Sequence, residues 1–152
     1  MGTEKKRISS IVLADDDDDD ALVFSETVKD IDPSIRFEHV ADGIKLMHLL
    51  QHYYPDILFI DLDMPRKNGL ECLFEIRTNK ILAKLPVVVF SSTTRPVNIQ
   101  TAYEMGADLY LIKTSQIKDY VSAVRTVLQL NWQHPEAIKK QYCINGRFAA
   151  FG

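Results

Sequence analysis

The chain has 152 residues, 46% of them hydrophobic, which is enough for one ordinary globular core and too short for two. Its formal net charge of -3, without any local cluster of Lys and Arg, argues against a nucleic-acid-binding surface. The polar residues 1–7 precede only a short apolar run, which predicts neither a secretory signal nor a membrane span. We therefore expect a one-domain cytoplasmic protein that binds neither nucleic acid nor membrane.

Short apolar runs alternate with longer amphipathic segments from residue 8 to about residue 130, a pattern typical of repeated strand-helix units. Several runs are apolar at consecutive positions, as expected for strands of a parallel sheet that helices cover on both faces. The five predicted strands are residues 8–14, 35–40, 57–60, 86–90 and 109–112.

The segments between these runs carry apolar residues at helical spacing, and the clearest of them ends near Leu130. Five strand-helix units in this length predict an α/β fold, a doubly wound five-stranded parallel sheet of flavodoxin type with strand order 2-1-3-4-5 and five helices. We expect an N-terminal tail at 1–7, the domain at 8–130 and an extension of unknown structure at 131–152. Within the extension, Asn145-Gly146 hints at a small hairpin.

Polar residues stand at the carboxyl ends of four predicted strands, where open α/β sheets bind ligands. Asp15 and Asp16 follow the first strand, Asp61 the third, Ser91 the fourth and Lys113 the fifth. In the order 2-1-3-4-5 these strands are neighbours, so the side chains should converge. Three close carboxylates repel one another unless a cation compensates, and a hard divalent ion such as Mg²⁺, or alternatively Mn²⁺, is the natural partner.

A carboxylate beside such an ion can attack phosphorus, because phosphoryl transfer needs mainly positioning and charge neutralisation. We interpret Asp61 as the nucleophile, with Lys113 and Ser91 contacting the transferred group. Asp63 should offer its backbone carbonyl to the metal. We expect Asp17 to Asp20 to be structural acids in the first turn of a helix that begins near Asp18 or Asp19.

At these residues the chain resembles the receiver domains of bacterial response regulators, of the stand-alone, CheY-like type. The matching pieces are residues 11–17, 55–65 with 68–69, 85–92 and 106–113. One departure is Thr114, since the family usually has proline after its lysine. The resemblance implies a phosphorelay role for each matching position: metal binding for Asp15 and Asp16, phosphorylation for Asp61, switching for Ser91 and Tyr110, and phosphoryl contact for Lys113. A tyrosine on an apolar strand is also ordinary packing, and that interpretation of Tyr110 stays open.

The resemblance also implies partners for this signalling phosphoacceptor, which would catalyse only its own phosphorylation and dephosphorylation. The phosphoryl group would come from a histidine kinase or a histidine phosphotransfer protein. Only about 22 residues follow Leu130, so output should pass through another, unidentified protein or a homodimer. The expected docking face consists of the fourth helix, fifth strand and fifth helix, exposed at about 95–103 and 116–125.

Two other functions stay open. Asp61-Leu-Asp63 after an apolar strand also resembles the start of haloacid dehalogenase-type phosphatases, in which the first Asp is the nucleophile and the second a general acid. Those enzymes usually carry the motif on their first strand and have a longer chain. The second alternative is a phosphate-independent interaction module that keeps only the fold. Cys72 and Cys143 lie far apart without metal-ligand spacing, so we expect free thiols.

Overall fold

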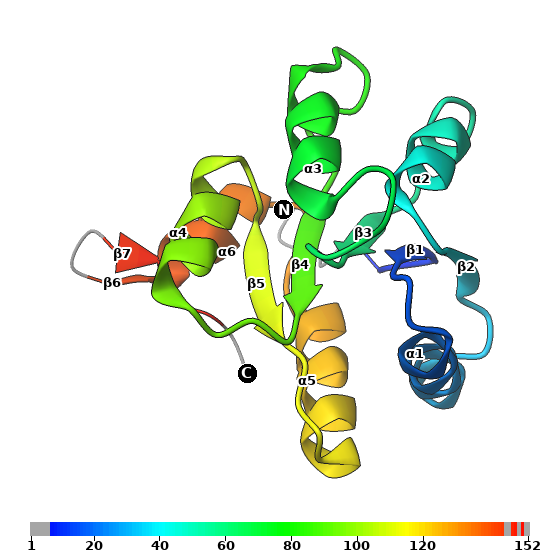
Figure 1. The fold of residues 1–152 in the computed structure, drawn as a ribbon. Coiled ribbons are helices and arrows are strands. Elements are labelled where there is room, and N and C mark those ends of the chain that lie inside the picture. Colours follow the sequence, from blue (N-terminus) through cyan, green and yellow to red (C-terminus); the bar gives the residue numbers. More distant parts are fainter. Residues whose placement is uncertain (1–6, 145–146, 149, 151–152) are drawn as a thin grey trace, which may run out of the picture.

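The computed structural model describes residues 7–144, 147–148 and 150, with the side chains of 144, 147 and 148 left out. Its centre is a five-stranded parallel sheet in the order β2-β1-β3-β4-β5 (Figure 1), as the sequence predicts. The strands are β1 Ser10–Ala14, β2 Arg36–Val40, β3 Ile57–Ile60, β4 Val87–Ser91 and β5 Leu109–Ile112.

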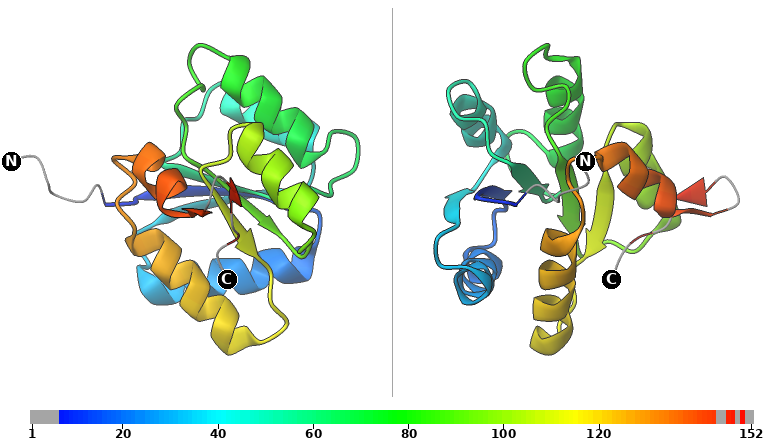
Figure 2. Two further views of the ribbon diagram at one scale, coloured as in Figure 1. Left: turned by 90° about the vertical axis from the view of Figure 1, so that its left-hand side faces the viewer. Right: turned by 180° about the vertical axis from the view of Figure 1, so that it is seen from behind.

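Helices cover both faces of this sheet. Figure 2 shows α1 and α5 on one face, and α2, α3 and α4 on the other. The helices are α1 Asp18–Ile31, α2 Gly43–Leu50, α3 Gly69–Thr78, α4 Pro96–Glu104, α5 Ile117–Gln129 and α6 Pro135–Gln141. The sixth helix was not predicted, because it is short and the extension shows no clear apolar period.

Side chains of alternate strand residues pack into two separate cores, one on each face of the sheet, which explains the continuous apolar runs in the sequence. Leu58 and Ile60 of β3 belong to the core under α2, α3 and α4, here called the α3-side core. Ile57 and Phe59 belong to the core under α1 and α5, here called the α1-side core. All four side chains have no exposed surface, and such burial stabilises the fold by roughly 2 kcal/mol for each large apolar residue.

The first strand begins two residues later than predicted, at Ser10. The preceding segment is held by Asp56, whose carboxylate accepts hydrogen bonds from the backbone amides of Ser9 at 2.8 Å and Ser10 at 3.2 Å. Ile8 is nevertheless 5% exposed and packs into the α1-side core. The apolar residue was therefore correctly placed in the core, although it lies outside the strand.

The described part of the extension is folded. After α6, the strands β6 Cys143–Ile144 and β7 Arg147–Phe148 pair in antiparallel fashion. This pairing agrees with the predicted hairpin, whose turn at residues 145–146 lies outside the described residues, as does most of the predicted tail at 1–7. Among the helices described, none is long and apolar enough to cross a membrane.

Candidate functional site

The polar residues singled out in the sequence meet at the carboxyl ends of the central strands. Asp15 follows β1, Asp61 follows β3, Ser91 ends β4 and Lys113 follows β5. The ladders hold the backbone at these positions, since the Asp61 amide donates to Ala14 O at 2.9 Å and the Lys113 amide donates to Ser91 O at 2.8 Å. Rigid strand ends therefore fix where the functional side chains begin.

Three carboxylates form the centre of the site. Asp15, Asp16 and Asp61 each offer an oxygen, and these oxygens lie within 4.8 Å of one another. Asp15 has no exposed surface and Asp61 is 7% exposed, whereas Asp16 is open to solvent. An ion bound between them would be held from inside the protein and still be reached from outside.

Lys113 is the cation at this centre. Its Nζ lies 2.7 Å from Asp15 Oδ2, 3.1 Å from Asp61 Oδ2 and 2.9 Å from Asp20 Oδ2. The replacement of the family's proline by Thr114 has therefore not displaced this side chain from the acids. One positive charge contacts three carboxylates, and Asp16 adds a fourth to the cluster, so the site keeps surplus negative charge.

Burial and charge shift the protonation of these groups. Burial raises the pKa of Asp61 to about 6, and Lys113 only partly offsets this rise. The pKa of Asp15 is also raised, first by burial. Burial alone would lower the pKa of Lys113, but its hydrogen bonds with Asp15 and Asp20 raise it above its ordinary value. Lys113 is therefore a permanent cation at neutral pH.

The donor set fits a hard divalent cation. It consists of carboxylate oxygens alone, which such ions prefer over nitrogen or sulfur. Burial raises the pKa of Asp15 and of Asp61, and a bound cation would favour the charged form of both carboxylates. The acidic pocket thus suits a divalent metal ion and a phosphoacceptor carboxylate.

The loop after β3 is shaped around Asp61. A Cβ on Gly69 would lie 2.3 Å from the Asp61 carbonyl oxygen, so only glycine permits this approach of α3. Asp63 donates its backbone amide to Asp61 Oδ1 at 3.2 Å, and its side chain is exposed. The backbone of Arg66 has a left-handed φ of 66°, a sparsely populated conformation for a residue with a side chain. Asp61 is therefore oriented by its own loop.

Ser91 and Tyr110 lie next to each other behind this centre. Ser91 is 1% exposed, and its Oγ accepts a hydrogen bond from the Thr93 amide at 3.2 Å. Tyr110 has no exposed surface, and its hydroxyl donates to Thr93 O at 2.8 Å. Burial raises the pKa of Tyr110, while a hydrogen bond with Ser91 lowers it. The ring thus already occupies the interior beside the loop that follows β4.

Two participants were missed in the sequence. Asp20 was expected to be purely structural, yet its carboxylate pairs with Lys113 because one helical turn brings it back toward Asp16. His39 was not singled out in the sequence, but its Nε2 lies 2.8 Å from Asp15 O. The prediction for Asp17 is confirmed, since it caps α1 through the amides of Asp19 and Asp20.

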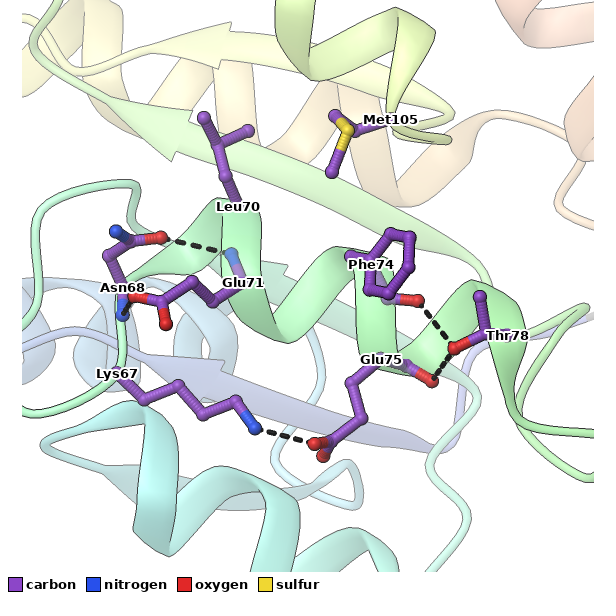
Figure 3. Close-up of a pocket in the computed structure, with 8 residues that line it drawn as sticks. All are labelled: Lys67, Asn68, Leu70, Glu71, Phe74, Glu75, Thr78 and Met105. Atoms are coloured by element: carbon purple, nitrogen blue, oxygen red, sulfur yellow. Dashed lines mark hydrogen bonds and ion pairs between the residues drawn. The ribbon is translucent and has the colours of Figure 1, made fainter.

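A groove of about 500 Å³ lies between α3 and the end of α4, away from these acids (Figure 3). Its apolar lining comes from Leu70, Phe74 and Met105, and its polar lining is largely paired internally, as Lys67 is with Glu75. The two glutamates of the lining are engaged locally, Glu75 with Lys67 and Glu71 with the Asn68 amide, and they form no convergent set. The acid cluster is the better candidate for chemistry.

Comparisons with known proteins agree with this geometry. Residues 11–125 match the model of the response regulator receiver domain. Response regulator Rcp1 of Synechocystis sp. is 28% identical over 134 residues, covering 84% of this chain and 91% of Rcp1. The nitrate/nitrite response regulator protein NarL of Escherichia coli is 33% identical over 84 residues, which are 55% of this chain and 38% of NarL.

Solved structures of response regulators also resemble this chain. The phosphorylated cyanobacterial phytochrome response regulator RcpA superposes with a TM-score of 0.75 at 25% identity, covering 80% of this chain and 91% of RcpA. The Mn²⁺-bound form of Rcp1 gives a TM-score of 0.70 at 29% identity, covering 78% and 91%. The chemotaxis response regulator CheY4 of Vibrio cholerae, at 22% identity, a TM-score of 0.69 and coverage of 79% and 98%, supports the fold alone. The family model matches more than half of this chain, which shows that the chain belongs to the response regulator receiver domains, which are signalling proteins.

Proposed function

We propose that Asp61 is the residue of this receiver domain that accepts the phosphoryl group. The observation that carries the proposal is a nearly buried carboxylate at the end of β3, 3.1 Å from Lys113 and within 4.8 Å of two further acids. Asp15 shares both the lysine and the acidic cluster, but it has no exposed surface, whereas Asp61 is 7% exposed and can be reached from solvent. Family membership and the partial exposure of Asp61 both support the assignment.

In the proposed reaction, a carboxylate oxygen of Asp61 bonds to phosphorus while the bond from phosphorus to the donor nitrogen breaks. The electron pair leaves with the nitrogen, which takes a proton. Lys113 balances the negative charge on the transferred oxygens, and its raised pKa keeps it charged throughout. The Ser91 hydroxyl donates a hydrogen bond to one of those oxygens.

Asp15 and Asp16, together with Asp61, would hold the divalent cation, with the Asp63 carbonyl as a further ligand. The cation supplies neutralisation of phosphoryl charge, and Mg²⁺ is the proposed physiological ion, with Mn²⁺ able to replace it. The Mn²⁺-bound form of Rcp1 supports the choice of ion class. Asp20 and His39 act as positioning residues, the first through Lys113 and the second through the Asp15 backbone.

The proposed phosphoryl donor is a histidine kinase or a histidine phosphotransfer protein, as the family membership suggests. We further propose that residues 8–130 make up the receiver domain and residues 131–152 an extension to it, in a cytoplasmic protein that catalyses only its own phosphorylation and dephosphorylation. A downstream protein or a second copy of the chain would dock on the face made by α4, β5 and α5.

The test is incubation with Mg²⁺ and acetyl phosphate, followed by intact mass measurement. The wild-type chain should gain one phosphoryl group, and chelation of the metal should prevent the gain. Asp61→Asn should remove the modification, whereas the matched variant Asp18→Asn, which changes an exposed acid of the same surface, should keep it. Full, persistent labelling of the Asp61→Asn chain would contradict the proposal.

Two measurements separate the alternatives. Multiple turnover of a generic phosphate ester such as p-nitrophenyl phosphate would favour a haloacid dehalogenase-type activity of Asp61 and Asp63. Failure to label with any donor, while partner binding persists, would favour the phosphate-independent module. The intact cluster of Asp15, Asp16, Asp61 and Lys113 favours the receiver function over both.

Signal transmission is tested through Ser91. Ser91→Ala should still accept the phosphoryl group, because the nucleophile and the cation site remain. It should fail to pass the change to Tyr110, whose hydroxyl contacts Ser91 and the Thr93 carbonyl. Amide chemical shifts around residues 91–112 that respond alike in both chains would rule out this route.

A further inference from the structure

The extension wraps around the free edge of the sheet. Among the described strands β5 pairs only with β4, so its outer side is a sheet edge. Trp132, 2% exposed, and Ile138, 5% exposed, pack into the α1-side core. Beyond them, β7 contacts α4 and Ala150 packs against the α3-side core. Figure 1 shows α6, β6 and β7 gathered beside α4 and β5.

Specific polar contacts fasten the extension at both ends of α6. Trp132 donates its indole N–H to Val127 O of α5 at 2.8 Å. Lys139 donates from Nζ to Tyr103 O of α4 at 2.9 Å. The second contact is the more informative, because a charged donor that satisfies a backbone carbonyl near the end of a helix stabilises that helix. The extension therefore recognises the C-terminal end of α4.

Tyr103 links this contact to the interior of the domain. It was expected on an exposed face, but it has no exposed surface, because its ring fills the space between α4 and β5. Its hydroxyl accepts a hydrogen bond from the Tyr110 amide at 3.0 Å, a group on the outer side of β5 that would otherwise lack a partner in the sheet. One residue thus contacts the extension with its backbone and β5 with its side chain.

The same path continues to the proposed phosphorylation site. The Tyr110 hydroxyl reaches Thr93 O, and the Thr93 amide reaches Ser91 Oγ. Contacts therefore run without interruption from the loop after β4, through Tyr110 and Tyr103, to Lys139 of α6. Such a chain of contacts transmits a change only if both ends favour the same conformation of the segment between them.

We propose that residues 132–144, together with 147–148, form a clamp on α4 and β5 that closes more tightly when Asp61 is phosphorylated. This inference rests on the proposed function. The clamp is docked while Tyr110 is fully buried beside Ser91 and Thr93. Attraction of Ser91 to a phosphoryl oxygen would draw its loop inward and stabilise this buried tyrosine, and with it the surface that the clamp binds.

A docked clamp alters the surface that is open to a downstream partner. The face made by α4, β5 and α5 is partly covered by this chain's own extension, so a partner or a second copy must contact the extension or displace it. The phosphorylation state then controls the partner through the clamp. The extension is the first recipient of the signal.

The chain carries a natural reporter of the clamp. Cys143 lies on β6 and is half-buried. The other cysteine, Cys72, has no exposed surface, and burial raises its pKa to about 11, so it stays protonated and inaccessible at the mildly alkaline pH of thiol labelling. The rate at which a chromogenic disulfide reagent labels Cys143 therefore measures opening of the clamp.

The experiment compares full-length chains in Mg²⁺ with and without beryllofluoride, which occupies the phosphoryl position on Asp61. We expect beryllofluoride to slow labelling of Cys143 by at least about fivefold, the lower end of coupling between two sites. Lys139→Met should speed labelling in both states, because it removes the bond to Tyr103. The matched control is Lys140→Met, an exposed neighbour on the same helix, which should behave as wild type.

Tyr103→Phe tests the coupling itself. It keeps the ring and the carbonyl that Lys139 binds, but removes the hydroxyl that accepts from Tyr110. The clamp should still protect Cys143, and the effect of beryllofluoride should disappear. Intact mass after acetyl phosphate treatment of the same chains distinguishes failure of Asp61 phosphorylation from failure of the clamp. If Asp61 is not labelled, the proposed function fails; if it is labelled but beryllofluoride leaves labelling of Cys143 unchanged or faster, the clamp is refuted alone.

Discussion

Two clusters of buried charge lie at opposite ends of the sheet, and they differ in how far cations compensate their carboxylates. At the amino end of β5, Asp108 pairs with Arg77 at 3.0 Å and accepts a hydrogen bond from the Val87 amide at 2.9 Å. Arg77 also donates to the carbonyls of Gly106, Ala83 and Leu85. One carboxylate there faces one guanidinium, and four of the five N–H donors of that guanidinium make hydrogen bonds. At the carboxyl end, Lys113 is the one cation among the described residues that contacts the acid cluster, and it pairs with three carboxylates.

The contrast teaches that balance, rather than burial, separates a structural charge cluster from a functional one. A balanced pair needs nothing further, so it holds α3, the loop before β4 and the start of β5 together. A cluster with surplus negative charge lowers the stability of the protein until a cation compensates it. Five substitutions test this difference, beginning with the largest expected effect.

Arg77→Met should destabilise the protein most. It leaves Asp108, whose side chain is 14% exposed, without its cation, and it removes hydrogen bonds to three carbonyls. We expect the free energy of unfolding to fall by about 3 kcal/mol or more, measured by urea denaturation. Lys84→Met, which changes an exposed cation at the same end of the molecule, should leave it within about 0.5 kcal/mol. Similar losses in both variants would mean that the Arg77 pair is not special.

Asp61→Asn should change the free energy of unfolding in the opposite direction. In the absence of divalent metal it removes a charge that burial disfavours, so stability at neutral pH should rise by about 1 to 2 kcal/mol. The folded-state pKa of Asp61, about 6, lies above its ordinary value, so its stabilising contribution is complete at low pH and is lost as pH rises through about 6. Thermal unfolding in chelator between pH 4 and 7 should show this decline in wild type and a weaker one in the variant.

Asp17→Ala separates the structural acids of the run from the functional ones. It removes the N-cap of α1, whose carboxylate accepts from the amides of Asp19 and Asp20, and should cost about 1 kcal/mol of stability. Phosphorylation of Asp61 should persist. Asp16→Ala should do the reverse, with little change in stability and a clear loss of Mg²⁺ affinity in a calorimetric titration. Equal Mg²⁺ affinity in both variants would remove Asp16 from the site.

Lys67→Met should have the smallest effect. Lys67 pairs with Glu75 beside the groove in Figure 3, but these side chains are 24% and 45% exposed. Water screens such a pair, so we expect a change in unfolding free energy of about 0.5 kcal/mol or less. A loss as large as that of Arg77→Met would show that exposure does not govern the value of ion pairs in this protein.

The sequence was sufficient for the sheet and for the meeting of Asp15, Asp16, Asp61 and Lys113. Periodicity places residues on strands, and the topology of a parallel sheet then brings the strand ends together. Asp20 was not found because six consecutive acids carry no internal distinction, and only the direction of α1 brings the last of them to Lys113.

The extension and Tyr103 escaped prediction for a related reason. Trp132 and Ile138 are two apolar residues in a polar stretch, too few to define a face, and their burial depends on a partner surface distant in sequence. Tyr103 looks like an exposed residue of an amphipathic helix until its hydroxyl is seen beside the Tyr110 amide. Tertiary contacts of this kind leave no local pattern.

The order in which the chain is synthesised gives the covered edge of β5 a further meaning. The acid cluster is complete once Lys113 has been made, but the contact of Lys139 with α4 requires 26 more residues, or about 1 to 5 s of translation. During that interval β5 offers an unpaired strand edge to any neighbouring chain. The extension thus closes the window for mispairing between nascent chains, and weakening it should lower the yield of monomeric protein at high expression before it alters any property of the finished fold.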